Sequence, residues 1–174
     1  MLSSLLIFIC NNLVNKIPFH FLRLFFYRKI MRFEIGKNSS ILMGVRFYGS
    51  RNFIMRENSV INDYCRIDNR GLIIIGNNVS ISSETYLITA YHNVHSCSFE
   101  NIIKPITIED FVFLGIRCTI LPGVDISTGA VAAAGSTVVK SIPEFVIVGG
   151  TPAIQIGERT RNLNYKINFR PLFQ

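Results

Sequence analysis

The stretch IEDFVFLGIRCTILPGVDISTGAVAAAGSTVVKSIP, residues 108–143, carries an apolar residue at every sixth position. The six members of the series are Ile108, Leu114, Ile120, Ile126, Ala132 and Val138. Neither an α-helix nor a single strand has this period, because their side chains repeat every ~3.6 and ~2 residues. The residue four positions after each member is mostly small or β-branched. Each hexad therefore predicts a short strand followed by a tight corner.

The same period extends upstream in three shorter series. They are Ile35, Ile41, Phe47; then Met55, Ile61, Ile67; then Ile75, Ile81, Leu87. The register slips by two residues between series, at Phe53-Ile54 and at Ile73-Ile74. If three strands make one turn of a triangular prism, both slips and a longer excursion at 93–107 fall at the same corner. We therefore predict an all-β fold, a parallel β-helix of about five triangular coils, whose backbone groups pair between coils.

The chain length of 174 residues suits one domain, 1–174. We expect an amphipathic helical segment at 1–31, the β-helix at 32–143 with its loop at 93–107, and a C-terminal tail at 144–174. The helical segment would cover one open end of the prism, and the tail would run back along the outside. Uncovered ends would leave unpaired strand edges.

Basic charge is concentrated near the N-terminus, where residues 1–56 hold nine Lys or Arg and a single acidic residue, Glu34. Within 1–31, Phe19, Leu22, Phe25 and Phe26 recur at helical spacing. This pattern suits a helix on an anionic membrane surface, and equally a helix packed on its own domain or on a partner subunit. Polar residues interrupt the apolar run before the ~20 residues that a membrane span needs. No nucleic-acid recognition motif is present, so we expect no nucleic-acid partner.

Composition narrows the class and the compartment. Hydrophobic residues make up 49% of the chain and charged residues 17%, which excludes intrinsic disorder. The cysteines are Cys10, Cys65, Cys97 and Cys118. They form no CxxC pair, so a reduced cytoplasmic setting is expected. A membrane-binding N-terminal segment would place the protein peripherally on the inner membrane.

Three motifs connect the repeat to a known family. The hexads IGNNVSIS (75–82), the run at 108–143 and VGGTPA (148–153) resemble the hexapeptide-repeat acyltransferases. The stretch INDYCRIDNRGLIIIGNNVSIS (61–82), followed by ITAYH (88–92), is similar to the sugar O-acetyltransferases, the maltose and galactoside enzymes and their polysaccharide-modifying relatives. The resemblance implies a left-handed winding, acetyl-CoA as cosubstrate, a sugar or glycan acceptor and a cyclic homotrimer.

The resemblance also implies catalytic residues. His92, in TAYHNVH (89–95), matches the family's catalytic histidine, and an imidazole suits a general base at neutral pH. Asn62 matches an active-site asparagine that can donate to a developing oxyanion or hold the acceptor hydroxyl. Asp68 and Asn69 lie where relatives place an acceptor-binding aspartate. His95 is the competitor for the catalytic role.

The residues expected to bind coenzyme A are Gly115, Ala134, Gly135 and Lys140. Small residues let the pantetheine arm approach the backbone, and Lys140 can meet a phosphate. The chain departs from the family at Ile154, where a basic residue is usual and which Arg159 or Arg161 would replace, and at Phe113, where tryptophan is usual. No metal is expected, because a catalytic zinc site takes three protein ligands and one of the chain's three histidines, His20, lies in another region.

The predicted function is therefore acetyl transfer from acetyl-CoA to a sugar hydroxyl in cell-surface polysaccharide biosynthesis, by direct transfer with His92 as base. Two alternatives stay open. One is acetylation of an amino sugar or an antibiotic, for which Glu84 or Glu100 would supply the carboxylate. The other is a non-catalytic β-helix scaffold. The sequence leaves open the acceptor's identity and the choice between O- and N-acetylation.

Overall fold

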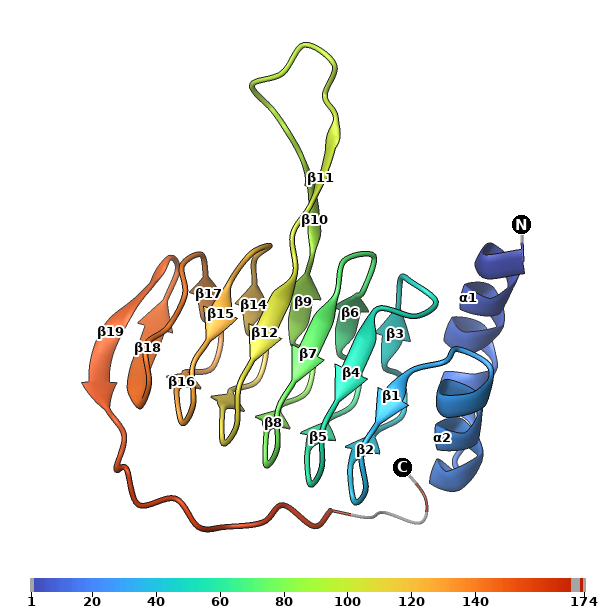
Figure 1. Ribbon diagram of the computed structural model, residues 1–174, viewed down its shortest axis with the longest axis horizontal. Coiled ribbons are helices and arrows are strands. Elements are labelled where there is room, and N and C mark those ends of the chain that lie inside the picture. Colours follow the sequence, from blue (N-terminus) through green and yellow to red (C-terminus); the bar gives the residue numbers. More distant parts are fainter. Residues whose placement is uncertain (1, 170–172, 174) are drawn as a thin grey trace.

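The computed structural model describes residues 2–169 and 173, and it forms a parallel β-helix whose three faces are sheets (Figure 1). The first face contains β1 (Glu34–Ile35), β4 (Phe53–Met55), β7 (Ile73–Ile75), β12 (Ile106–Ile108) and β15 (Asp125–Ile126). The second contains β2 (Ser40–Ile41), β5 (Val60–Ile61), β8 (Ser80–Ile81), β13 (Phe113–Leu114), β16 (Val131–Ala132), β18 (Val146–Gly150) and β19 (Ala153–Glu158). The third contains β3 (Arg46–Phe47), β6 (Arg66–Asp68), β9 (Tyr86–Ile88), β14 (Thr119–Ile120) and β17 (Thr137–Val138).

The six-residue series forms the core, as predicted. Every member is buried except Ile35 in the first coil, which is half-buried. Equivalent members stack in register from coil to coil, for example Ile41 on Ile61 and Ile61 on Ile81. Within 108–143 the residues four positions on are also buried, so each corner of these coils closes over a small or β-branched side chain.

The corners require a left-handed backbone. At the first edge, between the first and second faces, this conformation is taken by Asn38, Asn58 and Asn78, with φ of 60°, 55° and 55°. Asparagine tolerates positive φ better than most residues. The amide of Asn38 also donates to Asn58 Oδ1 at 3.0 Å, so the corner side chains form a ladder between coils.

All the insertions occur at the third edge, between the third and first faces. The two-residue slips lie in the turns 48–52 and 69–72, at the same edge as a long arm (Figure 1). In this arm β10 (Ala90–His92) pairs antiparallel with β11 (Asn101–Ile103). The arm therefore begins at Ala90, earlier than the loop expected from residue 93, because residues 90–92 pair with the returning strand instead of continuing the coil.

The N-terminal segment covers the open end of the first coil. It forms α1 (Leu2–Asn12), a 3-10 turn η1 (Val14–Lys16) and α2 (His20–Lys29). The rings of Tyr27 and Phe33 pack on the ring of Phe47, at centroid distances of 5.4 and 4.7 Å, and close this end of the core. Arg23 lies on the buried side of α2, where its guanidinium donates to the carbonyls of Ile17 and Ile41. It is therefore not one of the exposed basic residues of the N-terminal segment.

A sixth, partial coil follows the five that were counted from the sequence. Ile142 bridges to Ile126 on the first face, and β18 continues the second face beside β16. β19 then folds back antiparallel on β18 and covers this end of the sheet. The tail runs back along the prism to the first coil, where Ser40 Oγ of β2 donates to the Phe169 carbonyl at 2.5 Å (Figure 1). Within the described part of the chain, no helix is long and apolar enough to cross a membrane.

Candidate active site

His92 is the last residue of β10, and its ring is held by Phe99 in the loop that precedes β11. Its Nδ1 is 2.8 Å from the Phe99 carbonyl oxygen, and its ring stacks on the Phe99 ring at 4.4 Å with an interplanar angle of 2°. A carbonyl oxygen only accepts hydrogen bonds, so Nδ1 carries the proton in the neutral ring. The lone pair is then on Nε2, which is the arrangement that a general base needs.

A hydrogen-bonded cluster fixes the outer part of the arm. Ser98 Oγ and Asn93 Nδ2 each donate to the Glu100 carboxylate at 2.7 Å. Hydrogen bonds from Ser96, Ser98 and Asn93 lower the pKa of Glu100 to about 2. His95 lies in this segment with an exposed side chain, and its backbone N–H donates to Asn93 Oδ1. The arm therefore holds the ring of His92 and leaves that of His95 in solvent.

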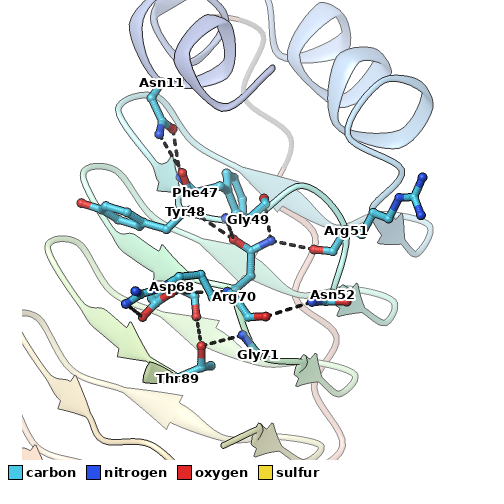
Figure 2. Close-up of polar contacts among 11 residues, drawn as sticks. Asn11, Phe47, Tyr48, Gly49, Arg51, Asn52, Asp68, Arg70, Gly71 and Thr89 are labelled. Atoms are coloured by element: carbon cyan, nitrogen blue, oxygen red, sulfur yellow. Dashed lines mark hydrogen bonds and ion pairs between the residues drawn. The ribbon is translucent and has the colours of Figure 1, made fainter. Parts of the chain in front are cut away.

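The root of the arm is anchored to the coil below it (Figure 2). Thr89 is fully buried, and its hydroxyl donates to the Asp68 carbonyl at 2.5 Å and accepts from the Gly71 N–H at 2.9 Å. The Asp68 carboxylate receives two bonds of 2.8 Å from Arg70. Burial raises the pKa of Asp68, but the hydrogen bonds from Arg70 outweigh it and the net shift is downward.

Asn69 is fully occupied within the fold. Its Oδ1 accepts from the N–H groups of Tyr48 and Gly49, and its Nδ2 donates to the carbonyls of Gly49 and Arg51. The side chain is completely buried. It therefore closes the turn of the preceding coil and has no group left for an acceptor.

Asn62 lies on a different edge from His92. It follows β5 at the second edge, between the second and third faces, whereas the arm leaves from the third edge. Its Nδ2 donates to the Ile81 carbonyl at 2.9 Å, and the side chain is half-buried. One chain therefore does not bring His92 and Asn62 together.

The residues expected to bind coenzyme A divide in the same way. Gly115, Ala134 and Gly135 lie on the second edge with Asn62, whereas Lys140 is exposed on the third edge after β17. A Cβ on Gly115 would come within 2.6 Å of the Ala134 backbone nitrogen, so only glycine fits there. Ala134 and Gly135 are exposed, and Gly135 has a φ of +72° with open space around it.

Arg159 does not reach the second edge. It donates to the Phe111 carbonyl at 2.7 Å on the first edge and to the Tyr165 hydroxyl at 3.1 Å, and so ties the tail to the prism. Arg161 lies over the Phe145 ring. Among the described residues, no group of three or more His, Cys, Asp or Glu is placed to hold a metal ion.

The sequence interpretation missed a cavity on the third face. It measures about 660 Å³ and is lined by Arg46, Arg66 and Tyr86 among others, and a neighbouring cavity of about 220 Å³ reaches Asp68 and Arg70. The signal was present in the sequence. The first coils are 20 residues long including the slip, and these three lining residues are spaced by 20.

Comparison with known proteins identifies the class of this fold. Residues 105–140 match the family model described as the hexapeptide repeat of succinyl-transferase. The chain is 32% identical over 134 residues to WcaF of Escherichia coli (strain K12), whose name connects it with acetyl transfer in colanic acid biosynthesis. That match covers 77% of this chain and 74% of WcaF. The galactoside O-acetyltransferase of the same organism is 33% identical over 151 residues, covering 79% and 71%.

A solved structure shows the same architecture over nearly the whole length. The hexapeptide-repeat acetyltransferase VCA0836 of Vibrio cholerae superposes with a TM-score of 0.84 at 28% identity, covering 91% of each chain. A second structure of that protein, complexed with acetyl coenzyme A, gives a TM-score of 0.77. The chain belongs to the hexapeptide-repeat acetyltransferase family. The predicted family, the left-handed β-helix and the assignment as an acyltransferase are thereby confirmed.

Proposed function

We propose that the protein transfers an acetyl group from acetyl-CoA to a sugar hydroxyl in cell-surface polysaccharide biosynthesis, with His92 as general base. The observation that carries the proposal is the held ring of His92, whose Nδ1 is engaged by the Phe99 carbonyl and whose Nε2 is free. The relatives named for galactoside O-acetylation and colanic acid biosynthesis support a sugar acceptor.

The reaction follows from that tautomer. Nε2 takes the proton of the acceptor hydroxyl while the oxygen attacks the thioester carbon. The tetrahedral intermediate collapses, the C–S bond breaks, and the departing sulfur receives the proton, which yields the acetyl ester and free coenzyme A. The two substrates react directly, and no acyl-enzyme forms.

The acceptor atom is proposed to be oxygen because the nearby carboxylates are already engaged. Glu84 is paired with Arg117 at 2.8 Å, and Glu100 is bound by the arm's own side chains. Neither is placed to assist the deprotonation of an amine.

The separation of His92 from the second edge supports a trimeric enzyme. In a cyclic trimer each arm can reach toward the second edge of the next chain, and three identical sites result. The exposed Ala134 and Gly135 backbone of that edge would then lie along the pantetheine arm of acetyl-CoA, with the half-buried Asn62 further along the same edge.

The N-terminal helices are proposed to rest on an anionic membrane surface. Phe8, Phe21 and Phe25 are 60%, 66% and 59% exposed. Exposed cationic side chains lie beside them, at Lys16, Arg28, Lys29 and Arg32. No acidic residue precedes Glu34, so the segment combines an apolar surface with unopposed positive charge.

Vesicle sedimentation tests the membrane proposal. The parent should sediment with vesicles that contain phosphatidylglycerol and stay in solution with pure phosphatidylcholine, and Phe21→Ser/Phe25→Ser should abolish binding. Ile154→Ser/Ile156→Ser removes two exposed apolar side chains from β19 at the other end of the prism and should bind like the parent. If the parent protein sediments with neither vesicle type, the proposal is contradicted.

A thiol-release assay with acetyl-CoA and a panel of oligosaccharides tests the enzymatic proposal. His92→Ala should lower turnover by about 10²–10⁴-fold, the contribution of a positioned base. His95→Ala is the matched control and should stay within about threefold of the parent. Parent-like turnover in His92→Ala would refute the assignment.

A further inference from the structure

Two arginines lie side by side on the outside of the third face. Arg46 of β3 pairs in register with Arg66 of β6, and Arg66 pairs with Tyr86 of β9. The next residues, Phe47, Ile67 and Leu87, are fully buried in the core, so these three side chains point outward. Arg66 and Tyr86 line two neighbouring cavities, the larger one with Arg46 and Lys16 and the smaller one with Tyr48. We call the two cavities together the arginine groove.

The positive charge of the groove has no internal counterpart. Like charges directly opposite each other on neighbouring strands destabilise a sheet. The two carboxylates that line the groove are already paired, Asp68 with Arg70, which also lines the groove, and Glu84 with Arg117. Within residues 2–169 and 173, Lys16, Arg46 and Arg66 make no ion pair. An anion bound between the two arginines would remove the repulsion.

Tyrosine rings give the groove an apolar floor with polar margins. The Arg66 guanidinium lies over the Tyr86 ring, 5.4 Å from its centroid, and its Nη1 is 3.4 Å from the Tyr48 hydroxyl. Tyr86 and Tyr48 are 38% and 40% exposed, so both rings have surface left for a ligand. A pyranose has an apolar face and a rim of hydroxyls, and it matches this combination of ring and hydroxyl.

The groove leads to the root of the arm that carries His92. One end lies against the N-terminal segment at Asn11 and Lys16. The other end reaches Asp68 and Arg70, directly beside the Thr89 anchor. The larger of its two cavities, of about 660 Å³, is in the range of small-ligand sites.

From this geometry we infer that the arginine groove binds the acceptor, and that the acceptor is an anionic glycan bearing a carboxylate or a phosphate. The inference rests on the proposed acetyl transfer and adds the charge class of its substrate. Arg66 is the main specificity residue, because it contacts both tyrosines and adjoins Arg46.

Matched acceptors that differ in charge test the inference. Thiol release from acetyl-CoA is measured with nitrophenyl glucuronide, with nitrophenyl glucoside and with a phosphate ester of the glucoside. The charged acceptors should exceed the neutral one in kcat/KM by about tenfold, a typical gain for a hydrogen bond to a charged group. The preference should shrink as salt is added. The carboxylate and phosphate arms identify which anion the groove prefers.

Three variants locate the effect. Arg66→Gln should bring the charged-to-neutral ratio toward one, and Arg66→Lys should keep part of it. Arg56→Gln removes the same charge from the exposed residue that follows β4, on another side of the prism, and should leave the ratio unchanged. A parent ratio near one, or a ratio that Arg66→Gln does not alter, overturns the inference. The inference is also overturned if Arg66→Gln changes the molecular mass of the assembly and leaves the charged-to-neutral ratio unchanged, because the groove would then be an interface between chains.

A binding measurement separates this inference from the proposed reaction. If no acceptor releases thiol, the proposed function fails, and saturation-transfer NMR with the glucuronide and the glucoside still tests the groove. Binding of the glucuronide alone, lost in Arg66→Gln, supports the groove, and equal binding of the two sugars overturns it. Thiol release that is equally fast with neutral and charged acceptors keeps the function and refutes the charge class.

Discussion

Replacing Thr89 with valine tests how the arm that carries His92 is anchored. Valine has nearly the same shape but lacks the hydroxyl, so the buried Gly71 N–H loses its 2.9 Å acceptor and the Asp68 carbonyl loses its 2.5 Å donor. Thr89 is inaccessible to solvent, so water does not replace either bond. At about 1–3 kcal/mol for each of the two unsatisfied groups, Thr89→Val should lower the free energy of unfolding by about 2–6 kcal/mol.

Urea denaturation at one fixed protein concentration measures this change. Thr89→Ser keeps the hydroxyl and should lose only about 1 kcal/mol for the missing methyl group. Turnover should fall in Thr89→Val even well below its unfolding midpoint, because the root of the arm moves. A valine variant as stable as the parent, or less damaging than the serine variant, would refute the anchoring role.

Three further substitutions probe the half-buried histidine of α2, the second edge and the ring stacked on His92. Burial, together with the charges of Arg23 and Arg28, lowers the pKa of His20 to about 4, so the free energy of unfolding should fall as the pH drops from about 6.5 to 4. In His20→Gln, denaturation at a series of pH values should show a smaller fall over this range. The same fall in the variant as in the parent would contradict the prediction. Gly115→Ala forces a Cβ against the Ala134 backbone, and it should lower the free energy of unfolding by about 1–3 kcal/mol and raise the KM for acetyl-CoA. If neither quantity changes, the backbone of the second edge can shift to accommodate the Cβ. Phe99→Leu removes the ring stacked on His92 and should lower kcat about two- to twelvefold at constant KM for acetyl-CoA. An unaltered kcat would show that the stacked ring does not position His92.

The six-residue period predicted the coil because the residues that repeat are the ones whose side chains point into the core. A position such as Ile61 or Leu114 must fill the same narrow core in every coil, so the sequence repeats what the geometry repeats. The extra partial coil was missed because Val146–Gly150 pairs with β16 as a longer strand that does not keep the hexad spacing.

Features that depend on contacts between distant segments could not be derived from periodicity. Arg23 is one of the basic residues of the N-terminal segment, yet it is buried, and its guanidinium donates to the carbonyls of Ile17 and Ile41. His92 was expected at the end of a coil, and it lies on the arm because residues 90–92 pair with β11. Its residue type and its edge were predictable, but the engagement of Nδ1 by Phe99 was not.

The central claim is that the arm of one chain and the second edge of its neighbour form one active site. Co-expressing His92→Ala and Asn62→Ala chains with different tags, in equal amounts, tests it through thiol release by the purified mixed trimers. Each variant alone should be nearly inactive. In every purified mixed trimer one of the three junctions has both residues intact, so the preparation should recover about a third of the parent's turnover. Mixed trimers no more active than the average of the two variants would contradict the claim.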